Sequence, residues 1–578
     1  MQRNLIRSFI LVLFFSLLLF IPKSLFIIFV PISILSYLSP ILTIGLILPF
    51  AGILTNYFLL ASALLVLFFQ VEDLKKGILT FLPFLIIVFS SLIFDFYYEI
   101  DFYSLKHLIG LEFTTLSNYL SNQPFGLINN LTLVLNYIIF FSLIFYFKNK
   151  DLSQLYIGLI ISLTIAFLLS ILDYFEIIDF LAQDYFWKKQ GRYYFTFSDP
   201  NSFGLFCLLA LILLFDYQKK LSAYKKYFII FLSVVVLCLA FLSGSRTYLV
   251  GLIIFIAFVL YLNHKKYFLI SLISLSALFV SHNLFSNFSS EYIINLKNLV
   301  PTGTHRIIDG LLVANINETF FSRAIFLKLN VGVINEYPLT GVGFNHFRDF
   351  ILEIAHLNNI NIGNWKDNTN NFYLGIISEL GFIGFIAFLI VFLSFRIDKN
   401  SSPILRAGLY TFLIALFFGP HLEFIEICIL FSILVAKTTN SKNLNYKFYF
   451  IPFIIIYIFI YKDVSFKVER GLYNKEQVGN KTYQWTSTNS RFLLLCENNT
   501  AQLKVKTFPQ LKENPNFKIK IKYNNQEYIR SFNKNLEERI SIDCQKSLMV
   551  EISANSCFFP AEHFSSNDKR CLGVQVYR

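Results

Sequence analysis

The chain has 578 residues, of which 56% are hydrophobic and only 15% are charged, with 69 phenylalanines and a mean hydropathy of +0.59. Apolar runs on this scale exceed what the core of a soluble globule can hide, so the composition excludes an ordinary soluble protein. The formal net charge is +13, and short basic clusters lie between the apolar runs. We therefore expect membrane lipids, and no nucleic acid, among the partners.

The chain begins with an apolar stretch, Ile10–Phe20, behind a basic start. It lacks a small-residue cleavage site and more apolar sequence follows at once, so we expect the N-terminus to stay in the membrane. Further apolar segments have the roughly 15 to 23 residues that a bilayer requires, and lipid leaves them no alternative to helix. The expected segments are 6–21, 24–38, 40–55, 57–71, 77–94, 128–147, 153–172, 201–216, 227–242, 247–262, 267–282, 372–394, 404–418, 423–436 and 447–461. The first four are short and could be fewer, longer or re-entrant elements, so we expect about twelve to fifteen spans.

Basic residues mark every second connection between these segments, which assigns those connections to the cytoplasm. They are Lys75–Lys76, Lys148 and Lys150, Lys219–Lys220 with Lys225–Lys226, Lys265–Lys266, Arg396 with Lys399 and Arg406, and Lys437 with Lys442. The alternate connections are 95–127, 173–200, 243–246, 283–371, 419–422 and the tail from 462. These should face outside, and 283–371 is the longest external loop.

The tail changes character at about residue 462, where polar residues replace Phe and Leu. Alternating runs indicate strands at Arg491–Cys496, Gln502–Phe508, Phe517–Tyr523, Tyr528–Phe532, Arg539–Cys544, Leu548–Ala554 and Leu572–Tyr577. Asn524–Gln526 indicates a hairpin turn. The chain thus divides into a membrane domain, 1–461, and a small all-β sandwich domain, 462–578. The positive charge of the tail could attract anionic glycans or lipid headgroups, or simply be a solvated surface.

The cysteines divide between the two parts. Those in apolar spans, expected to be small core residues, are Cys207, Cys238 and Cys428. Those in the tail are Cys496, Cys544, Cys557 and Cys571. An even set outside suggests two disulfides in an oxidising compartment, with three possible pairings. We favour the pairing of Cys557 with Cys571, which would close the Phe558–Arg570 loop.

Arginines gather in or beside the external connections. They are Arg192, Arg246, Arg306 and Arg323. A guanidinium stays charged and matches phosphate oxygens two at a time, so the cluster indicates a site for a lipid-linked phosphate or diphosphate. A lone arginine at a membrane boundary is more often an anchor, so the interpretation depends on the group. Asp199, just before a helix begun by Pro200, could orient Arg192.

The long external loop contains a predicted helix from about Glu318 to Glu336, which Pro338 ends. Arg323 falls near the start of this helix, where free backbone N–H groups would add to its attraction for an anion. The glycines of Leu339–Phe347 then form a turn that leads into a second amphipathic helix at about 345–357.

The next membrane segment carries a carboxylate, Glu379, less than three turns from its start. A carboxylate at such a depth costs on the order of 3 kcal/mol without a partner, so Glu379 should face the protein interior and pair with an arginine. Gly381 and Gly384 most simply allow close helix packing.

Jointly, these residues resemble a bacterial family, the O-antigen ligase and O-antigen polymerase superfamily with the related protein O-oligosaccharyltransferases. The matching motifs are Arg192 with Asp199–Asn201, the Gly244–Thr247 turn, Arg323 ahead of Pro338–Gly343, and Asn371–Leu374 with Glu379–Gly381. In order and spacing they cover about 190–395 of the chain.

The resemblance implies an all-α polytopic, GT-C-like fold in the bacterial inner membrane, with a large periplasmic loop and a periplasmic tail. It also implies a glycosyltransferase of lipopolysaccharide or other polysaccharide biosynthesis. The donor would be an undecaprenyl-diphosphate-linked glycan, and the acceptor lipid A-core, a growing glycan or a protein.

The family's arginines are thought to grip the diphosphate, which carries over here to Arg192, Arg246 and Arg323. Asn371 and Glu379 would belong to the same site, whereas Arg306 has no motif match and is a candidate by its charge alone. Guanidinium groups can neutralise the departing diphosphate without help, so we expect no metal and no cofactor.

The chain departs from the family at Asn370, where many ligases have a histidine suspected of activating the acceptor. An amide cannot take the proton. Either Asn370 orients the acceptor without a strong base, or another group serves. The candidates for that group are His346, Glu336, Asp367 and His305.

Two other classes of protein compete with an enzyme. A glycan flippase or proton-coupled transporter usually shows ionisable groups within helices and paired halves with broken segments, and only Glu379 suggests either. A structural polysaccharide-export subunit could carry the β tail but would not explain the matching motifs. Ligase, polymerase and protein-glycosylating transferase differ only in acceptor, and the sequence does not decide among them.

Overall fold

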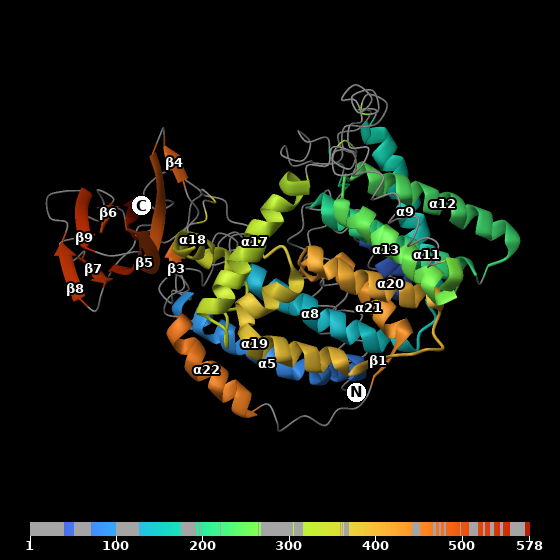
Figure 1. Ribbon diagram of the computed structural model, residues 1–578, viewed down its shortest axis with the longest axis horizontal. Helices are drawn as coiled ribbons and strands as arrows, with labels where there is room; N and C mark the ends of the chain where they lie inside the picture. The colour runs from blue at the N-terminus through green and yellow to red at the C-terminus, as the bar shows by residue number, and fades with distance from the viewer. Residues whose placement is uncertain are drawn as a thin grey trace, which may run out of the picture.

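The computed structural model describes residues 40–50, 71–99, 127–174, 369–441 and 451–465, then 192–267, 316–362 and 470–577 apart from gaps, and the single residues Lys297 and His305. Helices make up most of the described chain up to Ser465, and the later strands gather at one end of the molecule (Figure 1). The last helix ends at Ser465 and the next strand begins at Arg470, while the division into two domains at residue 462 stays a prediction.

The helices lie close to the predicted segments. They are α3 Pro40–Ile47, η1 Leu48–Phe50, α5 Val71–Glu99, α8 Leu127–Lys148, α9 Ser153–Tyr174, α11 Pro200–Gln218, α12 Ala223–Leu242, α13 Arg246–Asn263, α17 Ile316–Glu336, α18 Phe347–Leu357, α19 Phe372–Leu393, α20 Pro403–Ala415, η2 Leu416–Phe418, η3 His421–Glu423, α21 Ile425–Thr438 and α22 Ile451–Ser465. The expected segments 6–21 and 24–38, and all but one residue of 57–71 and of 267–282, lie outside the described residues.

Among the described residues, five helices are long and apolar enough to cross a membrane. These stretches are Val71–Leu92, Ser153–Leu172, Pro200–Gln218, Arg246–Asn263 and Phe372–Leu393. Shorter apolar helices in α8, α12 and α20 accompany them. The chain is therefore a multi-pass membrane protein by length and composition of its helices.

Helix α11 forms the centre of the helical part. Every residue from Leu205 to Leu214 is at most 1% exposed, and α12, α13, α20 and α21 all pack against it. A helix that is apolar on all sides is stable when lipid or protein covers it, and here the neighbouring helices do so. Its first turn, begun by Pro200, is thereby held rigidly among its neighbours.

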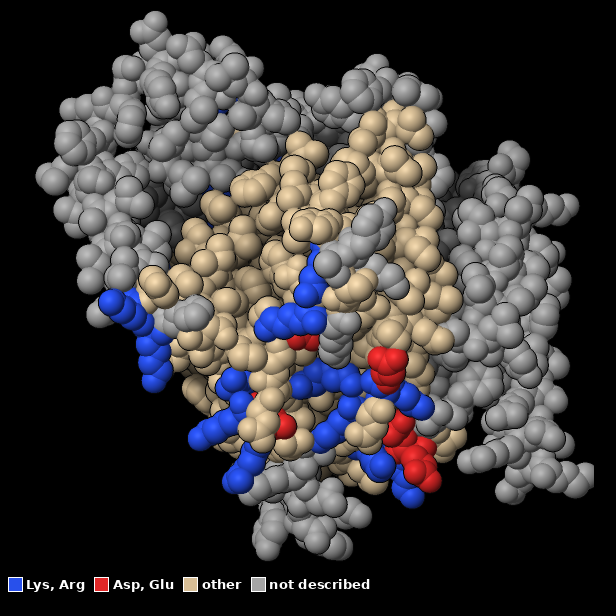
Figure 2. All heavy atoms as spheres, turned by 90° about the vertical axis from the view of Figure 1, so that its right-hand side faces the viewer, with Lys and Arg blue, Asp and Glu red and all other residues tan. Residues whose placement is uncertain are grey.

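The connections expected on the cytoplasmic side meet at one end of the helices. Lys437 Nζ donates hydrogen bonds to the carbonyls of Lys148 at 3.2 Å and Lys150 at 2.8 Å. Strand β1, Phe395–Ile397, pairs antiparallel with β2, Thr439–Ser441. Figure 2 faces this end and shows Lys and Arg side chains gathered there with a few acidic ones. Distant connections thus share one face, as the alternation of basic loops predicts.

Helix α19 is broken at Gly381, where φ is +66°. The loop after α17 fills the break with its own backbone. The hydrogen bonds run from Val342 N–H to the Ser378 carbonyl (2.9 Å), Gly343 N–H to Glu379 (2.7 Å), Phe382 N–H to Pro338 (2.9 Å) and Ile383 N–H to Leu339 (3.2 Å). The expectation that Gly381 allows close helix packing was wrong, because the helix gives up its own hydrogen bonds here and takes those of the loop.

The strands of the tail follow one hydrogen-bonded path. They are β3 Arg470–Leu472, β4 Glu476–Val478, β5 Lys481–Leu495, β6 Thr500–Lys506, β7 Lys518–Tyr523, β8 Gln526–Ser531, β9 Glu537–Asp543, β10 Ser547–Ala554 and β11 Gln575–Tyr577. Their order is β8-β7-β10-β5-β11-β6-β9, with β3 and β4 also on β5. Tyr523 pairs with Gln526, so the β7–β8 hairpin turns where the sequence predicts.

Strand β5 joins the two halves of this path. Its later residues pair with β10 and its earlier ones with β11, while Phe492, Val505 and Ile521 contribute to one shared core. The strands expected to form a sandwich are therefore joined in one hydrogen-bonded path that runs through β5. The first half of β5, together with β3 and β4, was not predicted because polar residues hide its alternation.

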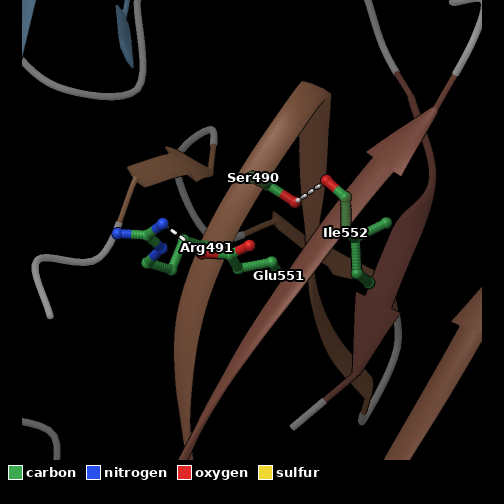
Figure 3. A network of polar contacts seen from close by, with 4 residues as sticks. All are labelled: Ser490, Arg491, Glu551 and Ile552. Atoms are coloured by element: carbon green, nitrogen blue, oxygen red, sulfur yellow. Dashed lines mark hydrogen bonds and ion pairs between the residues drawn. The ribbon is translucent and has the colours of Figure 1, made fainter. Parts of the chain in front are cut away.

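Polar contacts tie β5 to β10. Arg491 and Glu551 stand opposite each other in register and form an ion pair, and Ser490 Oγ donates to the Ile552 carbonyl at 3.4 Å (Figure 3). These contacts fix the register of two central strands.

The described cysteines follow the expected division with one exception. Cys496, directly after β5, is disulfide-bonded. The other tail cysteines lie outside the described residues, so the pairing of Cys557 with Cys571 stays a prediction. Cys207 and Cys428 are free and buried, whereas Cys238 is exposed and not the core residue that its apolar segment suggested.

Candidate functional site

Arg192 lies buried beside the turn between α12 and α13. Its Nε donates to the Ser243 carbonyl at 3.0 Å and its Nη2 to Asn201 Oδ1 at 3.0 Å. Asp199 accepts from Asn201 Nδ2 at 3.2 Å and caps α11 by accepting the Ser202 N–H at 2.9 Å. The sequence predicts that Asp199 orients Arg192, and the structure shows that it does so through Asn201.

The start of α11 touches this turn closely. A Cβ at Gly204 would stand 2.7 Å from Ser245 Cβ, so only glycine leaves room. Within the turn, Gly244 has φ +61°, and Ser245 Oγ accepts the Tyr248 N–H at 3.2 Å. Two motifs that are about forty residues apart in the sequence therefore form one surface.

Arg246 and Arg323 complete the group around the turn. Arg246 begins α13, and the next residue, Thr247, accepts a 3.5 Å hydrogen bond from Arg323 Nη2 through its hydroxyl. The Arg323 guanidinium also lies over the Phe418 ring, 5.4 Å from its centroid. Three of the predicted arginines thus surround one turn, while Arg306 lies outside the described residues.

The position of Arg323 in its helix differs from the expectation. Helix α17 begins at Ile316, so Arg323 lies two turns inside it and the free N–H groups of the first turn are not beside it. The sequence-based prediction placed the start of this helix too late, at about Glu318, because Ile316 and Asn317 are not typical helix-start residues in this context. Any anion would be held there by the guanidinium itself.

Asn330 couples the helix of Arg323 to the rest of the site. Its buried amide donates to the Thr369 carbonyl at 3.0 Å and accepts from Ser378 Oγ at 2.7 Å. Helix α17 is therefore tied to α19 and to the segment before α19. Such a fully satisfied buried amide fixes the helix in one position.

Asn370 and Asn371 stand at the start of α19. Asn371 caps the helix by accepting the Leu374 N–H at 3.0 Å, and Asn370 has φ +53° and is half-buried. Asparagine tolerates this left-handed conformation better than most residues. The backbone thus explains the presence of asparagine at both positions.

Glu379 does not pair with an arginine. Its Oε2 accepts the Asn345 N–H at 2.9 Å, and the backbone of Phe347 also donates to the carboxylate. No described arginine forms an ion pair with it, and Arg348 acts on it only through its charge. The expectation was wrong because the break in α19 places the carboxylate at the start of α18, where backbone N–H groups favour an anion.

Residues 231–389 match the family model described as O-antigen ligase. This part of the chain is similar to the O-antigen ligase family, and we refer to it by that similarity as the ligase domain. The match confirms the superfamily resemblance found in the sequence and includes Arg246, Arg323, Asn371 and Glu379. No curated protein matches the chain. The family is one of glycosyltransferase-like enzymes of polysaccharide biosynthesis.

The other proposed bases of the ligase domain lie in different surroundings. His346 is buried, and its backbone N–H donates to the Gly343 carbonyl at 3.2 Å. Glu336 is exposed at the far end of α17, about 20 Å along the helix from Arg323. A ring nitrogen of His305 is 2.8 Å from the Lys297 carbonyl, and Asp367 lies outside the described residues.

A small cavity of about 30 Å³ lies beside the start of α19. Glu379, Glu423, Thr369 and Pro420 contribute to its lining, with Phe344 among the apolar residues. Its size suits a water molecule and not a sugar ring.

Sequence reasoning missed His421, which the fold brings to the ligase domain from outside the matched residues. It lies in the short connection between α20 and α21, buried and close enough for the Arg323 charge to act on it. A histidine in a predicted external connection, 419–422, was the available signal. That connection is far from the arginines in the sequence, so the signal carried no weight by itself.

Proposed function

We propose that this protein transfers an undecaprenyl-diphosphate-linked glycan to an acceptor hydroxyl at the periplasmic face of the bacterial inner membrane. The observation that carries the proposal is the gathering of Arg192, Arg246 and Arg323 around the Ser243–Thr247 turn within and beside the ligase domain. A diphosphate needs several fixed positive charges, and guanidinium groups supply them in a geometry that suits phosphate oxygens.

The chemical role of these arginines follows from where charge develops. As the acceptor oxygen attacks the anomeric carbon, the bond to the diphosphate breaks and negative charge grows on the leaving oxygens. Guanidinium groups already in place stabilise that charge without reorganising. Arg192 is held by Ser243 and Asn201 and is therefore firmly positioned for this role.

A transporter remains the competing class, because α19 is a broken membrane helix of the kind that transporters use. In transporters the unwound backbone lines a cavity, whereas here the backbone of the loop Pro338–Gly343 fills the break. The break therefore supports a structural joint between the loop and α19, and the arginines favour an enzyme.

Substitution of the arginines tests the proposal. Purified full-length protein should transfer glycan from the lipid diphosphate in the presence of a metal chelator. Arg246→Ala and Arg323→Ala should each lower the turnover by about 10²-fold or more, while thermal unfolding in detergent changes little. Arg396→Ala, an exposed arginine at the opposite end, is the matched control and should keep wild-type turnover. Unchanged turnover in both site variants would refute the assignment.

The acceptor can be identified in the native host. A deletion strain that accumulates long glycan chains beside uncapped core lipid would indicate a ligase. Core lipid capped with single repeat units would indicate a polymerase, and loss of glycan from proteins alone would indicate a protein-glycosylating transferase. Gel analysis of glycolipids and glycoproteins separates these outcomes.

A further inference from the structure

His421 is a buried imidazole with an unused nitrogen. Its side chain is 4% exposed, and its Nε2 has no hydrogen-bond partner among the described residues. Buried polar groups are nearly always paired, so an unpaired one needs an explanation. A nitrogen that binds a ligand, or that accepts a proton during a reaction, is one such explanation.

The surroundings of His421 hold the ring in place. A Cβ at Gly419 would stand 2.8 Å from the His421 Cε1, so the ring packs directly on that glycine. The two residues that follow the histidine are anchored as well, because Asn136 Nδ2 donates to the Glu423 carbonyl at 2.8 Å and Cys428 Sγ to the Leu422 carbonyl at 3.1 Å. The imidazole is therefore a fixed group and not a mobile surface side chain.

The imidazole stands at the arginine site. Phe418, three residues before His421, lies under the Arg323 guanidinium, which also reaches Thr247 of the arginine-bearing turn. The positive charge of Arg323 acts directly on His421. One short segment thus brings an imidazole next to a group proposed to hold the diphosphate.

Burial and a neighbouring positive charge keep this imidazole neutral. Burial lowers the pKa of His421, and the Arg323 charge lowers it further, to about 3. The same segment carries Glu423, the packed helix α8 carries Tyr137, Tyr146 and Lys148, and the packed helix α21 carries Glu426, Cys428 and Lys437. Among charged groups, only Arg323 shifts the pKa of His421. A neutral imidazole can accept a proton, which Asn370 cannot.

We propose that His421 accepts the proton of the acceptor hydroxyl, and that a donor diphosphate bound at Arg323 makes it basic enough to do so. This inference rests on the proposed function. In the step, the hydroxyl oxygen forms a bond to the anomeric carbon and the O–H bond breaks, with the proton moving to His421. The bond between the anomeric carbon and the diphosphate oxygen breaks, and its electron pair leaves with the diphosphate.

The dependence on the donor follows from electrostatics. A diphosphate beside Arg323 cancels the positive field that disfavours imidazolium and adds negative charge that favours it. Donor binding therefore raises the pKa of His421 toward the working pH. By reciprocity, protonation of His421 tightens donor binding. Protonation of this group should therefore increase the affinity for the donor as the pH falls.

Replacement of the imidazole tests the inference. In full-length protein, His421→Gln should lower the single-turnover transfer rate by about 10²- to 10⁴-fold, the usual range for loss of a general base. The wild-type rate should rise with pH through one ionisation and then level off, and the variant should lose that ionisation. His356→Gln, on α18, removes an imidazole elsewhere and should leave both rate and profile unchanged.

Donor binding supplies an independent measurement. Inorganic pyrophosphate titrated into wild type and His421→Gln between pH 5 and pH 8 should bind with equal affinity at the upper end. Near pH 5 the wild type should bind pyrophosphate more tightly than the variant, because only the wild type has an imidazole to protonate. Ionisation of pyrophosphate itself affects both proteins equally. A variant that keeps the wild-type rate, pH profile and pH-dependent binding would overturn the inference.

Two further outcomes separate this inference from the proposed function. Transfer by the wild type, loss of transfer in Arg323→Ala and normal transfer in His421→Gln would together refute only the role of His421. If wild type neither binds pyrophosphate nor transfers glycan, the proposed function fails first. Should His421→Gln unfold, His421→Asn and the pH profile of the wild type alone carry the same test, and a flat profile would overturn the inference.

Discussion

At the scale of single residues, the site is organised by short polar side chains that hold longer charged ones. Asp199 caps α11, orients Asn201 and through it holds Arg192. The sequence indicates the cap, because Asp before Pro is a typical helix start. It does not indicate that the Asn201 amide lies between the carboxylate and the guanidinium, which depends on how the two chain segments meet.

Removal of the Asn201 amide tests this arrangement. Asn201→Ala should lower the free energy of unfolding by about 1.5–3 kcal/mol, since a hydrogen bond to a buried charged group is lost. Affinity for the lipid diphosphate should fall about tenfold as Arg192 loses its orientation. Asn263→Ala, which removes an exposed asparagine bonded only within its own helix, should change neither quantity. Thermal unfolding and titration calorimetry in detergent would measure both, and equal behaviour of the two variants would contradict the role of Asn201.

At the scale of elements, the external loop is built into the membrane helices by backbone hydrogen bonds. Gly341 and Gly381 approach each other's segments so closely that a Cβ on either would meet backbone atoms at 2.4 and 2.1 Å, respectively. Asn330 then ties α17 to α19. The sequence indicates the glycines but not their structural role. A glycine at a helix contact and a glycine at a helix break cannot be distinguished in a single sequence.

A methyl group at the break should separate the loop from α19. Gly381→Ala would place a side chain at φ +66° and against the Leu339 carbonyl, so it should cost about 1–3 kcal/mol from the backbone alone and lower transfer together with stability. Gly251→Ala in α13 is the matched control, because its Cβ would meet side chains and no backbone: the flexible end of Leu208 at 2.7 Å and the Thr411 methyl group at 3.8 Å. Similar melting temperatures for the two variants would contradict the account of the break.

At the scale of the whole molecule, the helices separate two kinds of positive charge. One end carries the lysine-rich connections that hydrogen bonds and the β1–β2 pair bring together. The arginine group lies instead at the turn that precedes α13 and at the start of α11. The positive-inside rule places the lysines in the cytoplasm, so the arginines would face the compartment where lipid-linked glycans are transferred.

Labelling of single cysteines tests that orientation. In a Cys238→Ser background, which removes an exposed free thiol, Glu336→Cys and Lys399→Cys each add an exposed thiol. A membrane-impermeant maleimide should label residue 336 in intact spheroplasts and residue 399 only after the membrane is opened. Labelling of both from the same side would contradict the assigned orientation.

From the sequence we predicted a polytopic membrane protein, the positions of most described helices and strands, and the resemblance to the O-antigen ligase family. These properties follow from apolar length, alternation and punctuating residues, which are local along the chain. Tertiary packing determines which polar groups meet: Arg192 with Asn201, Glu379 with the start of α18, and His421 with Arg323. The residues of these contacts are from nine to about a hundred positions apart. Such contacts depend on packing, which no periodic pattern in one sequence indicates.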